Sequence, residues 1–131
     1  MNQKKEILVN INSLWSDIQS VFSGYYPFLK MEMIKKGSPE HRITILASRT
    51  CLTHITANEP CIIDINNNRT VLEIMNDFKT KLGLEILVSR KSGNVWNIIS
   101  ITEEWTLKSQ NAAGEFISSQ PPISIIKGNK T

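Results

Sequence analysis

The sequence contains no apolar run long enough to cross a bilayer, so we expect no helical membrane span. Lys4 and Lys5 stand where a signal peptide carries its positive charges, but the apolar stretch that follows is interrupted by Asn10, Asn12 and Ser13. A secretory signal needs an unbroken apolar core of 7 to 15 residues. We therefore expect a cytoplasmic protein that does not engage a membrane.

Cysteine and histidine are scarce, with two of each in the chain. In a reducing compartment Cys51 and Cys61 are expected to be free thiols. Together with His41 and His54 they are weak candidates for metal ligands, and Cys51-x-x-His54 has a workable half-site spacing. No second pair completes a zinc pattern, so the sequence predicts no metal and no cofactor. A thiol or metal site at Cys51 and His54 is an alternative, because a helix would put both on one face.

A strong excess of one charge is also lacking. Fifteen basic residues are set against twelve acidic ones, which gives a net charge of +3. That value is too small to indicate nucleic-acid binding by itself. The 40% of hydrophobic and 21% of charged residues are typical of a globular domain. We expect one domain over residues 1–117, followed by a linker-like tail over residues 118–131.

Two segments have the three-four spacing of apolar residues that predicts an amphipathic helix. The first covers residues 7–22 and is expected to end at Gly24. The second begins at Thr70, whose side chain forms a capping box with a glutamate three positions later, and ends at Gly83. A shorter helix is expected over residues 105–111.

Strands are expected where apolar and polar residues alternate or where β-branched residues gather. The basic turn Arg90–Asn94, which contains a glycine, is typical of a hairpin connection between two of them. The sequence does not decide whether 41–58 holds a strand near Ile43–Leu46 or a short helix. The expected strands cover residues 28–35, 61–65, 84–89 and 95–101.

These elements predict an α+β fold with one domain. A four- to five-stranded mixed or antiparallel sheet would be packed by the N-terminal helix and the central helix. The order of elements over residues 61–111 resembles the ubiquitin-like β-grasp topology. A ferredoxin-like sandwich is the alternative.

Four short segments also resemble a group of small uncharacterised bacterial proteins. They are Tyr26–Glu32 (YPFLKME), Thr70–Glu73 (TVLE), Arg90–Trp96 (RKSGNVW) and Trp105–Asn111 (WTLKSQN). The resemblance implies no activity.

Candidate contacts to an anion or to nucleic acid are Arg69, Arg90, Lys91 and Trp96, because cations beside aromatic rings are a common nucleic-acid-binding combination. The hairpin is not a phosphate-binding P-loop, since its lysine precedes the glycine and no helix begins there. No nucleophile elbow or oxyanion loop is recognisable, so we expect no catalytic residue and no enzyme.

Apolar terminal segments are poorly held unless they pair, which makes Ile123, Ile125 and Ile126 candidate partner contacts. Our first hypothesis is a non-catalytic protein-interaction module, either a small subunit of a bacterial multiprotein assembly or a homodimer. Nucleic-acid binding through a basic and aromatic face is an alternative.

Overall fold

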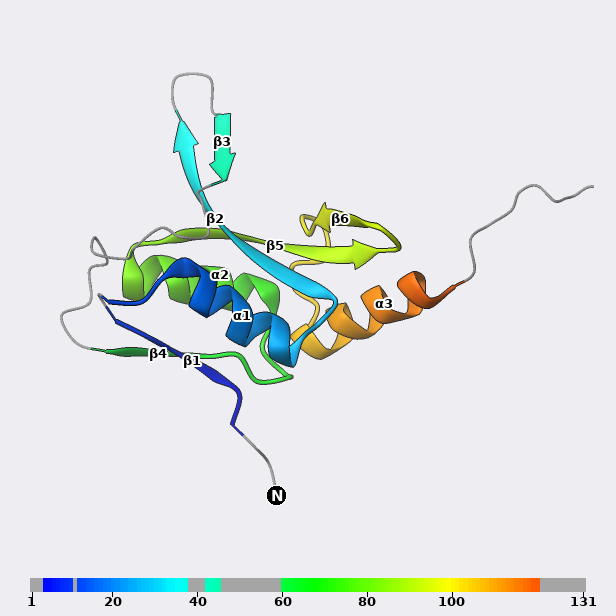
Figure 1. The fold of residues 1–131 in the computed structure, drawn as a ribbon, viewed down its shortest axis with the longest axis horizontal. Helices are drawn as coiled ribbons and strands as arrows, with labels where there is room; N and C mark the ends of the chain where they lie inside the picture. The colour runs from blue at the N-terminus through cyan, green and yellow to red at the C-terminus, as the bar shows by residue number, and fades with distance from the viewer. Residues whose placement is uncertain (1–3, 11, 38–41, 46–59, 121–131) are drawn as a thin grey trace, which may run out of the picture.

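The computed structural model describes residues 4–10, 12–37, 42–45 and 60–120, and they form a single α+β domain, which confirms the expected class (Figure 1). The elements are β1 (Glu6–Val9), α1 (Trp15–Tyr25), β2 (Leu29–Gly37), β3 (Arg42–Ile45), β4 (Cys61–Asp64), α2 (Val71–Asp77), the π-helix η1 (Phe78–Leu82), β5 (Glu85–Ser92), β6 (Val95–Ile98) and α3 (Leu107–Ser119).

The strands are divided between two antiparallel sheets. One has the order β3-β2-β5-β6, and the other consists of β1 and β4 alone. The four-stranded antiparallel sheet, contacted by the N-terminal and central helices, agrees with the expectation, but the strand predicted over residues 61–65 does not belong to it. The reason is that β4 pairs with β1, which lies in the segment that was predicted as a helix. The two strands form a separate ribbon. In Figure 1 this ribbon and the four-stranded sheet lie on opposite sides of α1 and α2.

The predicted N-terminal helix over residues 7–22 is instead a strand followed by a shorter helix. Burial alternates along β1, where Ile7 and Val9 face the core while the residues beside them are exposed. A turn separates the two elements, in which the Ser13 amide donates to the Asn10 carbonyl at 3.0 Å. Helix α1 then continues through Gly24 to Tyr25, so that glycine does not end it.

The central helix is formed as predicted at both ends. The Thr70 hydroxyl accepts from the Glu73 amide at 3.1 Å, and the Glu73 carboxylate accepts from the Thr70 amide at 2.9 Å, which completes the capping box. After α2 the backbone widens into η1, which ends at Gly83 with a left-handed φ of 71°. Glycine adopts this conformation without steric cost.

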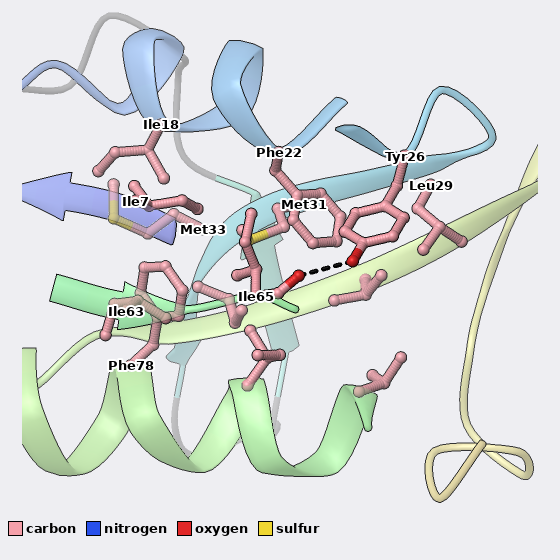
Figure 2. Close-up of a cluster of buried hydrophobic side chains, with 14 of the residues drawn as sticks. Ile7, Ile18, Phe22, Tyr26, Leu29, Met31, Met33, Ile63, Ile65 and Phe78 are labelled. Carbon is pink, nitrogen blue, oxygen red and sulfur yellow. Dashed lines mark hydrogen bonds between the residues drawn. The ribbon is translucent and has the colours of Figure 1, made fainter. Parts of the chain in front are cut away.

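The core is enclosed by α1, the α2–η1 helix, the inner faces of β2 and β5, and the β1–β4 ribbon (Figure 2). The Trp15 and Phe78 rings meet edge to face with their centroids 5.9 Å apart. The Tyr26 hydroxyl, at the end of α1, donates to the Ile65 carbonyl at 2.6 Å, so one polar contact inside the core fixes the chain after β4.

Helix α3 is longer than the helix expected over residues 105–111 and runs through Gly114. A Cβ atom at this position would lie 2.9 Å from the Phe28 Cβ and 3.1 Å from the Arg90 Cγ. The glycine lets the helix approach β2 and β5 closely, and α3 continues to Ser119. The domain boundary expected at residue 117 stays a prediction.

Candidate interaction surface

Strand β6 is an edge strand whose four side chains are all exposed. Within the described part of the chain it pairs with β5 alone, in a register that matches Arg90 with Asn97. The tight turn before it is made by Gly93, whose φ is 67°. The turn is shorter than the basic turn expected over residues 90–94. It consists of Gly93 and Asn94, while Arg90 and Lys91 belong to β5.

The segment between β6 and α3, and α3 itself, also carry exposed apolar side chains. Ile101, in the segment after β6, is 94% exposed, and Phe116 in the last turns of α3 is 66% exposed. The Ser118 hydroxyl accepts from the Gly93 amide at 3.0 Å, which holds the end of α3 beside the hairpin tip. We call the following residues the β6–α3 surface: Val95, Trp96, Ile98, Ile101, Trp105, Phe116 and Ile117.

Two of the predicted contact residues, Lys91 and Trp96, are brought together as cross-strand neighbours. The Lys91 ammonium lies 6.0 Å from the centroid of the Trp96 ring, and the Lys30 ammonium lies 5.0 Å from it. Lys30 was not anticipated from the sequence, because it belongs to β2. It also pairs with Glu32 at 3.3 Å, so this basic group is partly neutralised.

The two predicted arginines do not join that group, because each is engaged within the fold. Arg69 forms an ion pair with Asp77 at 2.6 Å beside α2. Arg90 precedes Lys91 in the strand and therefore points to the opposite face of the sheet. There its guanidinium donates to the side-chain oxygen of Gln110 at 2.7 Å and stacks on the Trp105 ring, 5.8 Å from its centroid.

Gln110 explains why Arg90 is held under α3. The Gln110 side chain is fully buried, and its amide nitrogen donates to the Thr102 carbonyl at 2.6 Å. A buried amide needs such partners, and the Arg90 guanidinium supplies the other one. Arg69 thus links the segment before α2 to that helix, and Arg90 links β5 to α3.

Of the four predicted thiol and metal candidates, one lies among the described residues. Cys61 is a free cysteine, half-buried at the start of β4 and packed against the core. The other three, His41, Cys51 and His54, lie outside the described residues, as do the candidate partner contacts Ile123, Ile125 and Ile126. Among the residues that are described, no group of three or more potential metal ligands occurs.

Two shallow hollows border the outer side of α1. One, of about 320 Å³, is lined by Ser20, Val21, Gly24 and Tyr25. The other, of about 270 Å³, is lined by serines of α1 together with Gln19 and Lys30. Both are wide open, and neither combines an acid with a base as catalysis would require.

Comparisons of the chain with known protein families, with curated proteins and with solved structures find no match. None of the helices in the described ranges combines the length and apolar character needed to cross a membrane. Among the described residues, the β6–α3 surface carries more than half of the large exposed apolar side chains. Its sequence signal is the uncharged segment Val95–Ile101 (VWNIISI), which predicts a strand and contains the candidate nucleic-acid contact Trp96.

Proposed function

We propose that the protein is a non-catalytic interaction module that contacts another protein chain through the β6–α3 surface. The observation that carries the proposal is the edge of β6, which has no second partner strand in the described ranges and whose exposed side chains include no charged residue. A cytoplasmic location and a role as a small subunit of a bacterial assembly, or as a homodimer, belong to the same proposal.

Exposed apolar residues are common one at a time; here Trp96 lies on the face of the hairpin that bears Lys91, and Trp105 lies beside Arg90 on the opposite face, so apolar side chains flank the strand edge. Trp96 and Trp105 are of the residue type that is enriched in binding hot spots. An unpaired strand edge beside them offers backbone hydrogen bonds to an incoming strand. These features support protein binding without requiring a reactive group.

Affinity capture from a lysate of the source cells tests this proposal with the full-length tagged chain. The wild type should retain a specific protein other than itself. The Ile101→Ser/Phe116→Ser double variant should lose it, because it removes two exposed anchors of the surface. A matched control is Leu8→Ser/Ile62→Ser, which removes the exposed apolar pair of the β1–β4 ribbon and should retain the partner.

Two outcomes would count against the proposal. The first is a chain that stays monomeric in light scattering and captures nothing above the tag alone. The second is a partner that both double variants lose equally, or that neither loses. Circular dichroism of each variant establishes that the fold is retained.

A second candidate function is binding of single-stranded nucleic acid, and the specific observation in its favour is the Trp96 ring bordered by Lys30 and Lys91. Bases stack on exposed rings while cations contact the phosphates. This candidate predicts binding of a fluorescently labelled oligonucleotide, measured by anisotropy, that weakens as salt rises.

The Lys30→Gln/Lys91→Gln variant should lower that affinity much more than Lys4→Gln/Lys108→Gln, which removes the same charge elsewhere. The absence of an anisotropy change at low ionic strength would exclude this function.

A further inference from the structure

The open edge of β6 fits a second copy of this chain. We propose that two copies pair their β6 strands antiparallel about a two-fold axis, so that two four-stranded sheets join into one eight-stranded sheet. This inference rests on the proposed function and names the partner at β6. Three observations carry it: the direction of the free peptide groups, the length of the strand, and the distribution of charge.

The free peptide groups belong to Trp96 and Ile98. The Ile99 amide donates to the Val88 carbonyl at 2.9 Å, which continues the register of Arg90 with Asn97. In an antiparallel pair every second residue directs both of its peptide groups at the partner strand. Asn97 therefore bonds to β5, while the N–H and C=O groups of Trp96 and Ile98 point away from the sheet.

One register uses all of these groups. In antiparallel pairing, opposed residues share a face, so a two-fold axis must pass between two copies of the same residue. With the axis at Asn97, Trp96 of each copy lies opposite Ile98 of the other, and the two pairs exchange about four hydrogen bonds. An axis at Trp96 or at Ile98 would need peptide groups of Asn94 or Ser100, which lie outside the strand.

The side chains suit this register as well. Trp96 would pack beside Ile98 of the second copy, and pairs of an aromatic with a β-branched residue stabilise antiparallel strands. Lys30 and Lys91 belong to β2 and β5, on the inner side of Trp96, so like charges do not meet at the axis.

The other open edges in the described residues are less suited to pairing. Glu6, Arg42 and Asp64 put a charge in β1, β3 and β4 respectively, whereas β6 contains neither a charge nor a proline. Charges on an edge strand discourage pairing with another chain. An unprotected β6 edge would promote open-ended association. Pairing about a two-fold axis covers the β6 edge of both copies at once.

Light scattering and sedimentation of the full-length protein test the dimer. We expect a wild-type dimer whose affinity changes little between 50 mM and 500 mM salt, because no ion pair crosses the axis. Ile98→Lys should yield a monomer, since it puts like charges near the axis. Ile62→Lys is the matched control and should remain dimeric, because Ile62 is also a strand isoleucine and is 50% exposed, against 53% for Ile98.

Cross-linking tests the register. In a background of Cys51→Ser and Cys61→Ser, Asn97→Cys would put two thiols across the axis with Cα atoms about 4.5 Å apart, within the range for a disulfide. Oxidation with diamide should then produce a covalent dimer. Asn94→Cys is the control, because its two copies would lie roughly 20 Å apart along the strands and should not cross-link.

The outcomes separate this inference from the proposed function. A monomeric wild type that still captures another protein through Ile101 and Phe116 overturns the dimer and keeps the interaction module. A monomer in which the Trp96 and Ile98 amides are protected from hydrogen exchange assigns the edge to another segment of the same chain, and likewise overturns the dimer. A dimer that Ile98→Lys leaves intact overturns pairing through β6.

Discussion

Tyr26 stabilises the fold through a single hydroxyl group. Its side chain is 2% exposed, and its hydroxyl group donates to the Ile65 carbonyl. The hydroxyl oxygen also lies 2.9 Å from the side-chain oxygen of Asn67. Burial, helped by the charge of Asp64, raises the pKa of Tyr26 from 10.0 to about 12. The neutral phenol is thus the form that the native state favours.

Tyr26→Phe should lower the free energy of unfolding at pH 7 by about 1–2 kcal/mol, because the Ile65 carbonyl loses its donor inside the core. A raised pKa stabilises the fold fully below pH 10, and this contribution declines as the pH rises toward 12. The difference between the wild type and the variant should therefore narrow above pH 10. Urea unfolding at pH 7 and at pH 11 measures both effects.

Tyr25→Phe is the control for this prediction, since the Tyr25 ring is more than a third exposed and should contribute little. A Tyr26→Phe variant as stable as the wild type at pH 7 would contradict the structural role of the hydroxyl.

Single residues also mark the limit of what the sequence could predict about the site. An arginine has the same appearance in a sequence whether it binds a ligand or a neighbouring segment. Arg69 is matched by Asp77, and Arg90 is matched by Gln110 on a helix packed across the sheet. Only the tertiary fold reveals these partners, whereas the pairing of Lys91 with Trp96 follows from a hairpin that could be predicted.

Among the elements, the central helix and the β5–β6 hairpin were predicted well, whereas Gly24 and Gly114 do not end their helices. The capping box at Thr70, the left-handed Gly83 and the glycine of the β5–β6 turn depend on neighbouring residues alone. The first element was predicted wrongly because Ile7 and Leu8 fit the spacing of a helix as well as that of a strand. Burial of Ile7 and exposure of Leu8 distinguish the two patterns.

Ile7→Ala should destabilise the protein by about 2–5 kcal/mol, because it leaves a cavity among the core side chains. Leu8→Ala should change the stability by less than about 0.5 kcal/mol, since the Leu8 side chain is 59% exposed. Chemical unfolding of the two variants measures both losses of stability. Equal losses would favour the helical interpretation, in which both residues belong to one apolar stripe.

At the scale of the whole molecule, the α+β class and the single domain followed from composition and from the order of elements. The division into two sheets could not be predicted, because strand pairing across a long separation leaves no local signal. Of the β6–α3 surface, Trp96 was marked from the sequence, as a candidate contact to nucleic acid rather than to protein. The rest of this surface includes the segment after β6 and the last turns of α3, and only folding brings the end of α3 beside the hairpin tip.

The β1–β4 ribbon also has a consequence for biosynthesis. Val9 pairs with Cys61, so more than 50 residues separate the two strands. A growing polypeptide must be translated beyond β4 before its first strand acquires a hydrogen-bonding partner. Until that moment Ile7 and Val9 remain in water, and chaperones that recognise short apolar stretches have an early opportunity to bind the emerging chain.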